Sequence, residues 1–274
     1  MTIEFFFKGL SVEDRLFPHT VGRSAELAKG TLYEAWFDTL KISPWYRKIS
    51  LSGKYPSEKA KLTWDSFGDL TEINFDAWWK KRGYKIFSES VPFMPMKIDN
   101  LSIHIEESKN IKKPPTLKIE VPLNLSPAEL KYQFNQILRN HEVYAEDYDR
   151  WDHSTAQVHQ YRESKLSYGT IKKWLYVFEE FERRKHHKEF KLYNLARDLE
   201  LHPTLFKGLT KSRVIPTDLR VQASNVVSDV LKLGRNVMAN ATEMKFPCTD
   251  PHQWATSRKS SKAEEPDWFD LDSD

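Results

Sequence analysis

A single cysteine, Cys248, occurs among the 274 residues of this chain, and glycine occurs only nine times. One thiol excludes an internal disulfide framework and any zinc site made from several cysteines. The few glycines form neither a G-x-x-x-x-G-K-[ST] nor a G-x-G-x-x-G pattern, the two loops whose backbone holds phosphate groups. A G-x-S-x-G turn, which presents a nucleophilic serine, is also missing. From these absences we expect a protein that is not an enzyme and that holds no cofactor and no metal.

Long apolar runs are absent as well. No stretch approaches the ~18 uninterrupted apolar residues of a membrane span. The chain begins Met-Thr-Ile-Glu-Phe-Phe-Phe-Lys, with an acid where a signal peptide has a basic region. Hydrophobic residues nevertheless make up 39% of the chain, which is enough for a folded core. We therefore expect a soluble cytoplasmic protein without a membrane partner.

Charge is distributed unevenly along the chain. Lys and Arg number 42 against 39 Asp and Glu, a formal net charge of +3. The last eleven residues, 264–274, hold six acids and no base, so residues 1–263 carry a net charge of +9. A basic body with an acidic end is typical of proteins that bind polyanions, or of a tail that competes for the protein's own basic face. A tail that only improves solubility is the open alternative.

Aromatic residues concentrate in residues 1–90, which we interpret as a helical N-terminal unit. Helices are expected over 24–44, with Ser24 as the N-cap, over 56–68 and over 74–83. Five tryptophans fall within these helices or between them: Trp36, Trp45, Trp64, Trp78 and Trp79. They predict either an aromatic core or a platform on which nucleic-acid bases stack.

A small β region is expected over residues 91–125 and just before it. Apolar and polar residues alternate at 85–88, 101–106 and 116–122, with prolines between these segments. The pattern predicts an antiparallel sheet of two or three strands. Such a sheet is marginal alone, so we expect it to pack against a helix.

Residues 126–247 predict a helical C-terminal domain, followed by a flexible acidic tail over 248–274. Ser126-Pro127-Ala128-Glu129 combines an N-cap, a proline at the first helical position and a capping-box glutamate. Further helices are expected from Thr170, over 192–199 and from Pro216. The predicted fold class is therefore mainly α with a small antiparallel β-sheet, an α+β protein with helical N-terminal and C-terminal units.

The region 191–213 has the apolar rhythm of a helix–turn–helix. Leu195 and Ala196 form the inner face of its first helix, and a turn is expected near 200–203. An ordinary pair of packed helices is the open alternative. The preceding cationic run, 183–188, is explained in part by the dipole of its own helix, which favours cations at the C-terminal end.

Ten residues in and before this region are predicted to bind nucleic acid, either at phosphates or in a groove. They are Lys172, Lys173, Arg183, Arg184, Lys185, Lys188, Thr204, Lys207, Lys211 and Arg213.

One pattern of a nucleic-acid enzyme and one possible pair of metal ligands are present, each incomplete. His159 and Arg162 have the H-x-x-R spacing of tyrosine recombinases, with Tyr193 downstream, but the upstream arginine of that chemistry is not identifiable. Glu182 and His186 share a helix face, yet the flanking cations favour a structural role over metal ligation. We therefore assign no catalytic residue and no metal ligand.

The segments Trp36-Phe-Asp-Thr-Leu-Lys-Ile-Ser-Pro-Trp-Tyr46, Phe67-Gly-Asp and Phe75-Asp-Ala-Trp-Trp79, with Phe87, resemble a loosely defined group of proteins. Bacteriophages, phage satellites and integrative elements carry these proteins, which have no assigned activity. The resemblance covers mainly residues 30–90. It implies a mobile element in a bacterial host cell and leaves the biochemistry open.

Together these features predict a non-enzymatic DNA-associated accessory or regulatory protein of a phage-like mobile element. The alternative is an assembly or scaffolding protein that binds a capsid-type protein partner through an aromatic surface and the acidic tail. In that case Trp268, Phe269 and Leu271 are the apolar anchors of the tail, and the acids around them meet a basic rim. The oligomeric state stays open.

Overall fold

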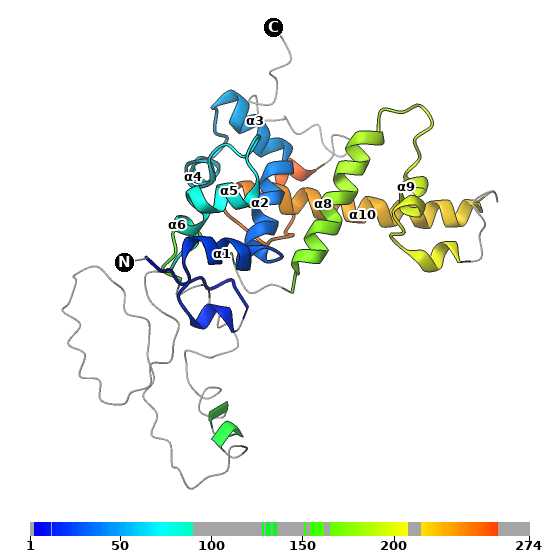
Figure 1. Ribbon diagram of the computed structural model, residues 1–274. Coiled ribbons are helices and arrows are strands. Elements are labelled where there is room, and N and C mark those ends of the chain that lie inside the picture. Colours follow the sequence, from blue (N-terminus) through cyan, green and yellow to red (C-terminus); the bar gives the residue numbers. More distant parts are fainter. Residues whose placement is uncertain are drawn as a thin grey trace, which may run out of the picture.

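The computed structural model describes most of the chain outside one long central segment and the C-terminal end. The described residues are 3–11, 13–89, 151, 154–161, 165–207 and 215–256, with a few helical positions between 128 and 135. They are mainly helical, which confirms the predicted α class (Figure 1).

The predicted small antiparallel sheet is not found in the described ranges, where the chain forms no strand. Only two isolated antiparallel bridges occur there, Phe5 with His19 and Phe6 with Glu89. Residues 101–106 and 116–122, two of the three expected strands, lie outside the described residues.

Short helices make up the N-terminal unit. They are η1 (Asp14–Leu16), α1 (Val21–Ala28), α2 (Leu32–Ile42), α3 (Pro44–Ser52), α4 (Glu58–Phe67), α5 (Phe75–Trp78), η2 (Trp79–Gly83) and α6 (Tyr84–Phe87). Side-chain oxygens of Thr20, Thr31, Ser43, Ser57 and Asn74 accept backbone N–H groups at the starts of α1 to α5. These caps fix where each helix begins, because they satisfy donors that have no partner inside the helix.

The expected helix over 24–44 is in fact two helices. Ser24 lies inside α1, not at its start, and its hydroxyl accepts a hydrogen bond from the Trp79 indole at 3.0 Å. Gly30, with φ at +72°, turns the chain between α1 and α2. The apolar period continues across this break because both helices bury a face in the same core.

The helix that begins after Asn74 does not end at Gly83. It widens into a π-helical turn, η2, and continues as α6, so the strand expected at 85–88 is a helical turn instead. Ile86 and Phe87 are adjacent in sequence and both are buried. In a strand, adjacent side chains point to opposite faces, so only one of the two would face a core on one side.

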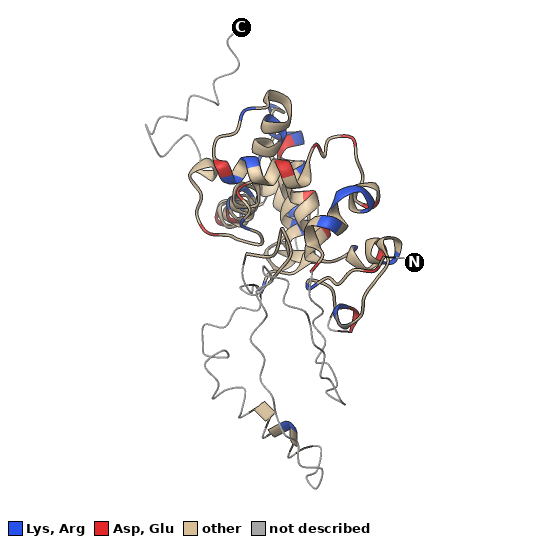
Figure 2. Ribbon diagram, turned by 90° about the vertical axis from the view of Figure 1, so that its left-hand side faces the viewer, with Lys and Arg blue, Asp and Glu red and all other residues tan. Residues whose placement is uncertain are grey.

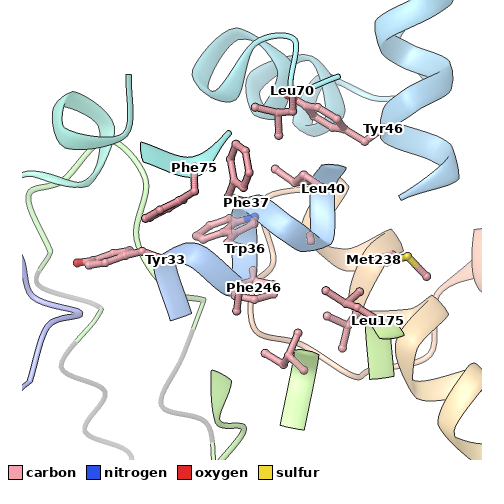
Figure 3. Close-up of a cluster of buried hydrophobic side chains, with 14 of the residues drawn as sticks. Tyr33, Trp36, Phe37, Leu40, Tyr46, Leu70, Phe75, Leu175, Met238 and Phe246 are labelled. Carbon is pink, nitrogen blue, oxygen red and sulfur yellow. The ribbon is translucent and has the colours of Figure 1, made fainter. Parts of the chain in front are cut away.

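The aromatic residues form the core of the molecule (Figure 3). Trp36, Trp78 and Trp79 are each at most 1% exposed. The Trp36 ring stacks on Phe246 from the far end of the chain, with 5.1 Å between ring centroids. The prediction of an aromatic core is therefore confirmed, and these three indoles are not available as a stacking platform for bases.

Longer helices make up the C-terminal unit. They are α8 (Tyr168–Arg184), α9 (Leu192–Asp198), η4 (Pro203–Phe206), α10 (Thr217–Thr242) and η5 (Gln253–Ala255). The long α10 packs against α9, α8 and α2, and runs from the α9 end of the molecule into the N-terminal helices (Figure 1). One hydrophobic cluster contains residues of both units.

After α10 the chain turns back along the helix. The side-chain amides of Asn236 and Asn240 donate to the carbonyls of Thr249 and Asp250, at 3.2 and 2.8 Å. The following residues lead to Trp254, whose ring lies 6.4 Å from that of Trp45 on α3. Residues 248–256 of the predicted tail are thus part of the folded body.

Glu89 joins the two sides of the central segment. Its carboxylate is 6% exposed and accepts hydrogen bonds from Ser154 Oγ at 2.6 Å and from the backbone N–H of Thr155 at 2.6 Å. Its own N–H donates to the Phe6 carbonyl at 2.9 Å. Residues 89 and 154–155, more than sixty positions apart in the chain, therefore lie side by side.

Candidate nucleic-acid interface and neighbouring cleft

Helix α8 carries most of the predicted nucleic-acid contacts. It begins at Tyr168, two residues before the expected start at Thr170, and Ser167 Oγ caps it by accepting from the Thr170 N–H at 3.2 Å. Ile171, Leu175 and Phe178 are buried on one face, which leaves the charged residues of α8 on the other. Blue and red stretches occur on the same helices in Figure 2, so residues of both charge signs are interspersed along the described helices.

The arginines at the end of α8 are bound to carboxylates. Arg183 and Arg184 contact Glu180 at 2.5 and 2.6 Å, and Arg184 also reaches Asp198 on α9 at 2.9 Å. Hydrogen bonds, first from Arg183 and then from Arg184, hold the pKa of Glu180 below its usual value. Much of the positive charge of the run 183–188 is therefore neutralised locally.

Two lysines of the predicted site are paired in the same way. Lys185 contacts Glu182 at 2.5 Å, and Lys172 contacts Asp38 on α2 at 2.8 Å. Burial raises the pKa of Asp38 above its usual value, although the hydrogen bond and charge of Lys172 act in the opposite direction. The Lys172–Asp38 pair thus ties α8 to α2 more than it presents a cation to a ligand.

The remaining six predicted contacts divide into three groups. Lys173, Lys188 and Lys207 are exposed and have no carboxylate within 4.0 Å among the described residues. Thr204 Oγ1 is hydrogen-bonded to His202 Nδ1 at 2.7 Å. Lys211 and Arg213 lie outside the described residues.

The first half of the expected helix–turn–helix lies among the described residues, whereas residues 208–213 of its second half lie outside them. Leu195 and Ala196 on α9 are fully buried, as predicted, and α9 packs on α10. The turn follows, with Glu200 in the left-handed region at φ +49°. In the part that the structure describes, the second element is η4, a single 3-10 turn of four residues and not a helix long enough to fill a groove.

A cleft of about 1010 Å³ opens beside the charged face of α8. It lies between α2, α3, α5, α8 and α10. Six cationic side chains line it: Lys41, Arg47, Lys172, Arg183, Lys185 and Arg235. Four carboxylates line it as well: Glu34, Asp38, Glu179 and Glu182. The balance of charge in the cleft is positive.

Arg47 and Arg235 differ from the other cations of this cleft. Within the described residues neither forms an ion pair, whereas Lys172, Arg183 and Lys185 each do, and the Lys41 amine donates to the Ile73 carbonyl at 2.8 Å. The Arg235 guanidinium lies 5.6 Å from the ring centroid of Phe181. Sequence patterns did not identify either arginine, because one is on α3 and the other on α10, and only the packing of those helices brings them together.

A serine, a glutamate and a histidine meet at the end of α10, but not in the order of a catalytic triad. Ser57 Oγ donates to Glu243 at 2.6 Å, and His252 Nε2 donates to the other oxygen of the same carboxylate at 3.0 Å. The serine is therefore held by the carboxylate and not activated by the imidazole. Its oxygen also accepts the Ala60 N–H at 3.1 Å, as the cap of α4.

Other chemical candidates do not come together in the described ranges. No three His, Cys, Asp or Glu side chains gather there as metal ligands, and Glu182 is bound to Lys185. Arg162 of the H-x-x-R pattern lies outside the described residues, and the Tyr193 ring is covered by the Arg220 guanidinium at 5.5 Å. None of the described helices is both long enough and apolar enough to cross a bilayer.

Comparisons with known proteins give no match. No protein-family model matches the chain, and no match was found among curated proteins or solved structures. The resemblance to proteins of phages and integrative elements stays a prediction from the aromatic motif.

Proposed function

We propose that this chain is a non-enzymatic accessory protein of a phage-like mobile element that associates with DNA through contacts to phosphates. The observation that carries the proposal is the separation of charge. Residues 1–263 carry a net charge of +9, and residues 264–274 hold six acids and no base. A net positive body attracts a polyanion, and contacts to phosphates hold it without reading its sequence.

The ion pairs on α8 decide which cations make these contacts. Arg183, Arg184 and Lys185 would have to leave their carboxylates to bind phosphate, so they add little. Lys173, near the start of α8, and Lys188 and Lys207, beyond its end, carry no such cost. About three phosphate contacts predict weak, sequence-independent binding whose log Kd changes with log salt by a slope of about 3.

Fluorescence anisotropy of a labelled duplex of about 20 base pairs, two helical turns, tests the proposal. The full chain should bind at low salt, and the affinity should fall along the expected slope between about 50 and 200 mM KCl. Replacing Lys173, Lys188 and Lys207 together with Glu should weaken binding by at least about tenfold, a loss of about 1.4 kcal/mol.

A charge-matched control separates local contacts from net charge. Lys54, Lys81 and Lys232 are exposed, lie outside both the predicted contacts and the cleft, and have no carboxylate partner in the described ranges. Their joint replacement with Glu should leave binding within about threefold of the original. Absence of any binding at low salt, or an equal loss in both triple variants, contradicts the assignment.

A further inference from the structure

The cleft beside α8 combines donors for anions with apolar surface. Arg47 and Arg235 line it, and no carboxylate of the described residues accepts from either one. Ile42, half-buried, and Pro44, exposed, add apolar surface at the same cleft. Guanidinium groups bind carboxylates through two parallel hydrogen bonds, which makes a pair of them well suited to an acidic peptide.

The folded body ends at the edge of this cleft. Trp254 lies against Trp45, which lines the cleft, and the described residues end two positions later at Thr256. From Thr256 to Trp268 the chain has twelve residues, which can span at most ~40 Å. Helix α8, which borders the cleft, has 17 residues and is ~25 Å long. The last residues of the chain are therefore within reach of the whole cleft.

The composition of these last residues matches the cleft in both respects. Residues 264–274 contain six acids, no base and three large apolar side chains, those of Trp268, Phe269 and Leu271. A segment tethered this closely has an effective concentration of order mM at its own cleft, so even weak contacts keep it bound. An acidic peptide on another molecule must compete with that concentration.

We propose that residues 264–274 bind in this cleft of their own chain, with carboxylates on Arg47 and Arg235 and the aromatic side chains on the apolar surface beside them. The tail is then a resident ligand of the folded body, and the cleft is a site for acidic peptides. The assignment does not depend on the proposed association with DNA.

Photo-crosslinking of the full chain tests this arrangement directly. Phe269 is replaced with p-benzoylphenylalanine, the purified protein is irradiated without DNA, and cross-linked peptides are identified by mass spectrometry. The expected cross-links join residue 269 to the segments of α3, α8 and α10 that line the cleft, with a yield that does not depend on protein concentration. Cross-links that lie elsewhere on the body overturn the proposal, and so does a yield that rises with concentration, which indicates a second copy as the occupant.

Charge reversal at the cleft provides the second test. The double variant Arg47→Glu, Arg235→Glu should lower the cross-linking yield at least about fivefold, as expected when two charge-assisted contacts become repulsive. The matched variant Lys54→Glu, Lys232→Glu makes the same change in net charge outside the cleft and should keep the original yield. Equal loss in both variants, or no loss in either, contradicts the proposal.

Two further measurements show that a lower cross-linking yield does not come from a misfolded variant. Circular dichroism shows whether each variant retains the helical body. In the unsubstituted cleft, raising KCl to about 1 M, where the Debye length falls to about 3 Å, should lower the yield as the ionic contacts are screened. Because none of these experiments contains DNA, a failure here leaves the proposed DNA association untouched, and a failure to bind DNA leaves the cleft assignment standing.

Discussion

Glu243 connects two segments that are far apart in the chain. It follows α10 and accepts hydrogen bonds from Ser57, at the start of α4, and from His252, in the returning segment. The Trp254 N–H donates to Nδ1 of His252, so Nε2 carries the hydrogen that reaches the carboxylate. The hydrogen bond from His252, with that from Ser57 acting in the same direction, holds the pKa of Glu243 below its usual value.

Replacing Glu243 with Gln should lower the free energy of unfolding by about 1–2 kcal/mol at neutral pH, because two hydrogen bonds to a charged acceptor become neutral ones. The pKa of Glu243 is lower in the folded chain than its unfolded 4.5. The ionised carboxylate therefore stabilises the fold fully above that unfolded value, and the stabilisation is lost as the pH falls through the folded pKa.

Urea denaturation of the original and substituted chains at several pH values measures this difference. The gap between the two stabilities should be largest near neutral pH and should shrink below the unfolded pKa. Glu26→Gln is the control, since Glu26 and its partner Arg23 are 65% and 59% exposed and such pairs contribute little. A gap that stays constant with pH would show that the carboxylate charge is not the cause.

At the scale of elements, the π-helical turn η2 is shaped by two tryptophans. A Cβ atom added at Gly83 would lie 2.8 Å from ring atoms of both Trp78 and Trp79. Both indoles are fixed, because they are buried and their N–H groups donate to the Phe67 carbonyl and to Ser24 Oγ. Glycine is therefore needed here for close packing and not for an unusual backbone angle.

Gly83→Ala should destabilise the protein by about 1–3 kcal/mol, because neither ring can move aside without disturbing the core. Gly22→Ala is the matched comparison in α1, where an added Cβ meets nothing within 4 Å. That change should be neutral or stabilising by up to about 1 kcal/mol, since alanine favours helix. Thermal denaturation of the two variants should move the midpoint in opposite directions or move it only for Gly83→Ala.

Local signals in the sequence predicted the helix starts well where the residue just before the helix determines the start. Asn74, Ser57 and Pro216 lie at the expected helix starts. Ser24 and Gly83 were wrong as boundaries, for different reasons. Thr20, and not Ser24, caps α1, so the right local signal lay four residues earlier. Gly83 is packed against Trp78 and Trp79, and such a contact has no local signature.

The candidate sites divide along the same line. The pairing of Arg184 with Glu180 and of Lys185 with Glu182 follows from spacings of four and three residues on one helix, and could have been predicted. The pairing of Lys172 with Asp38 and the placement of Arg47 and Arg235 in one cleft depend on how distant helices pack. No spacing along the chain contains that information.

At the scale of the whole molecule, the Glu89 contacts bring described residues from the two sides of positions 90–150 to one place in the body. Ser154 and Thr155 donate to the Glu89 carboxylate, and the Val158 N–H donates to the Ile86 carbonyl at 2.8 Å. Trp151, 2% exposed with the Lys8 amine 5.6 Å from its ring, belongs to the body.

Replacing residues 90–150 with a Gly/Ser linker of about eight residues should therefore leave a folded body. A linker of that length spans the gap between residues 89 and 151 and lowers the entropic cost of closing the loop. The shortened chain should unfold in one cooperative transition and keep the near-ultraviolet dichroism of the buried tryptophans. Loss of cooperativity in the shortened chain contradicts this prediction. In the same shortened chain, Glu89→Ala should lower the free energy of unfolding by about 2–4 kcal/mol.

The position of Phe246 against Trp36 has a consequence for synthesis on the ribosome. The aromatic cluster of the first ninety residues stays incomplete until residue 246 has been translated, on the order of 8 to 30 seconds after Phe87. Through that interval the nascent polypeptide exposes the apolar surface of this aromatic cluster, and any prematurely terminated product keeps it exposed. Chaperone capture of the growing chain, and rapid proteolysis of products that stop before residue 246, are the expected cellular signs of a core that Phe246 completes.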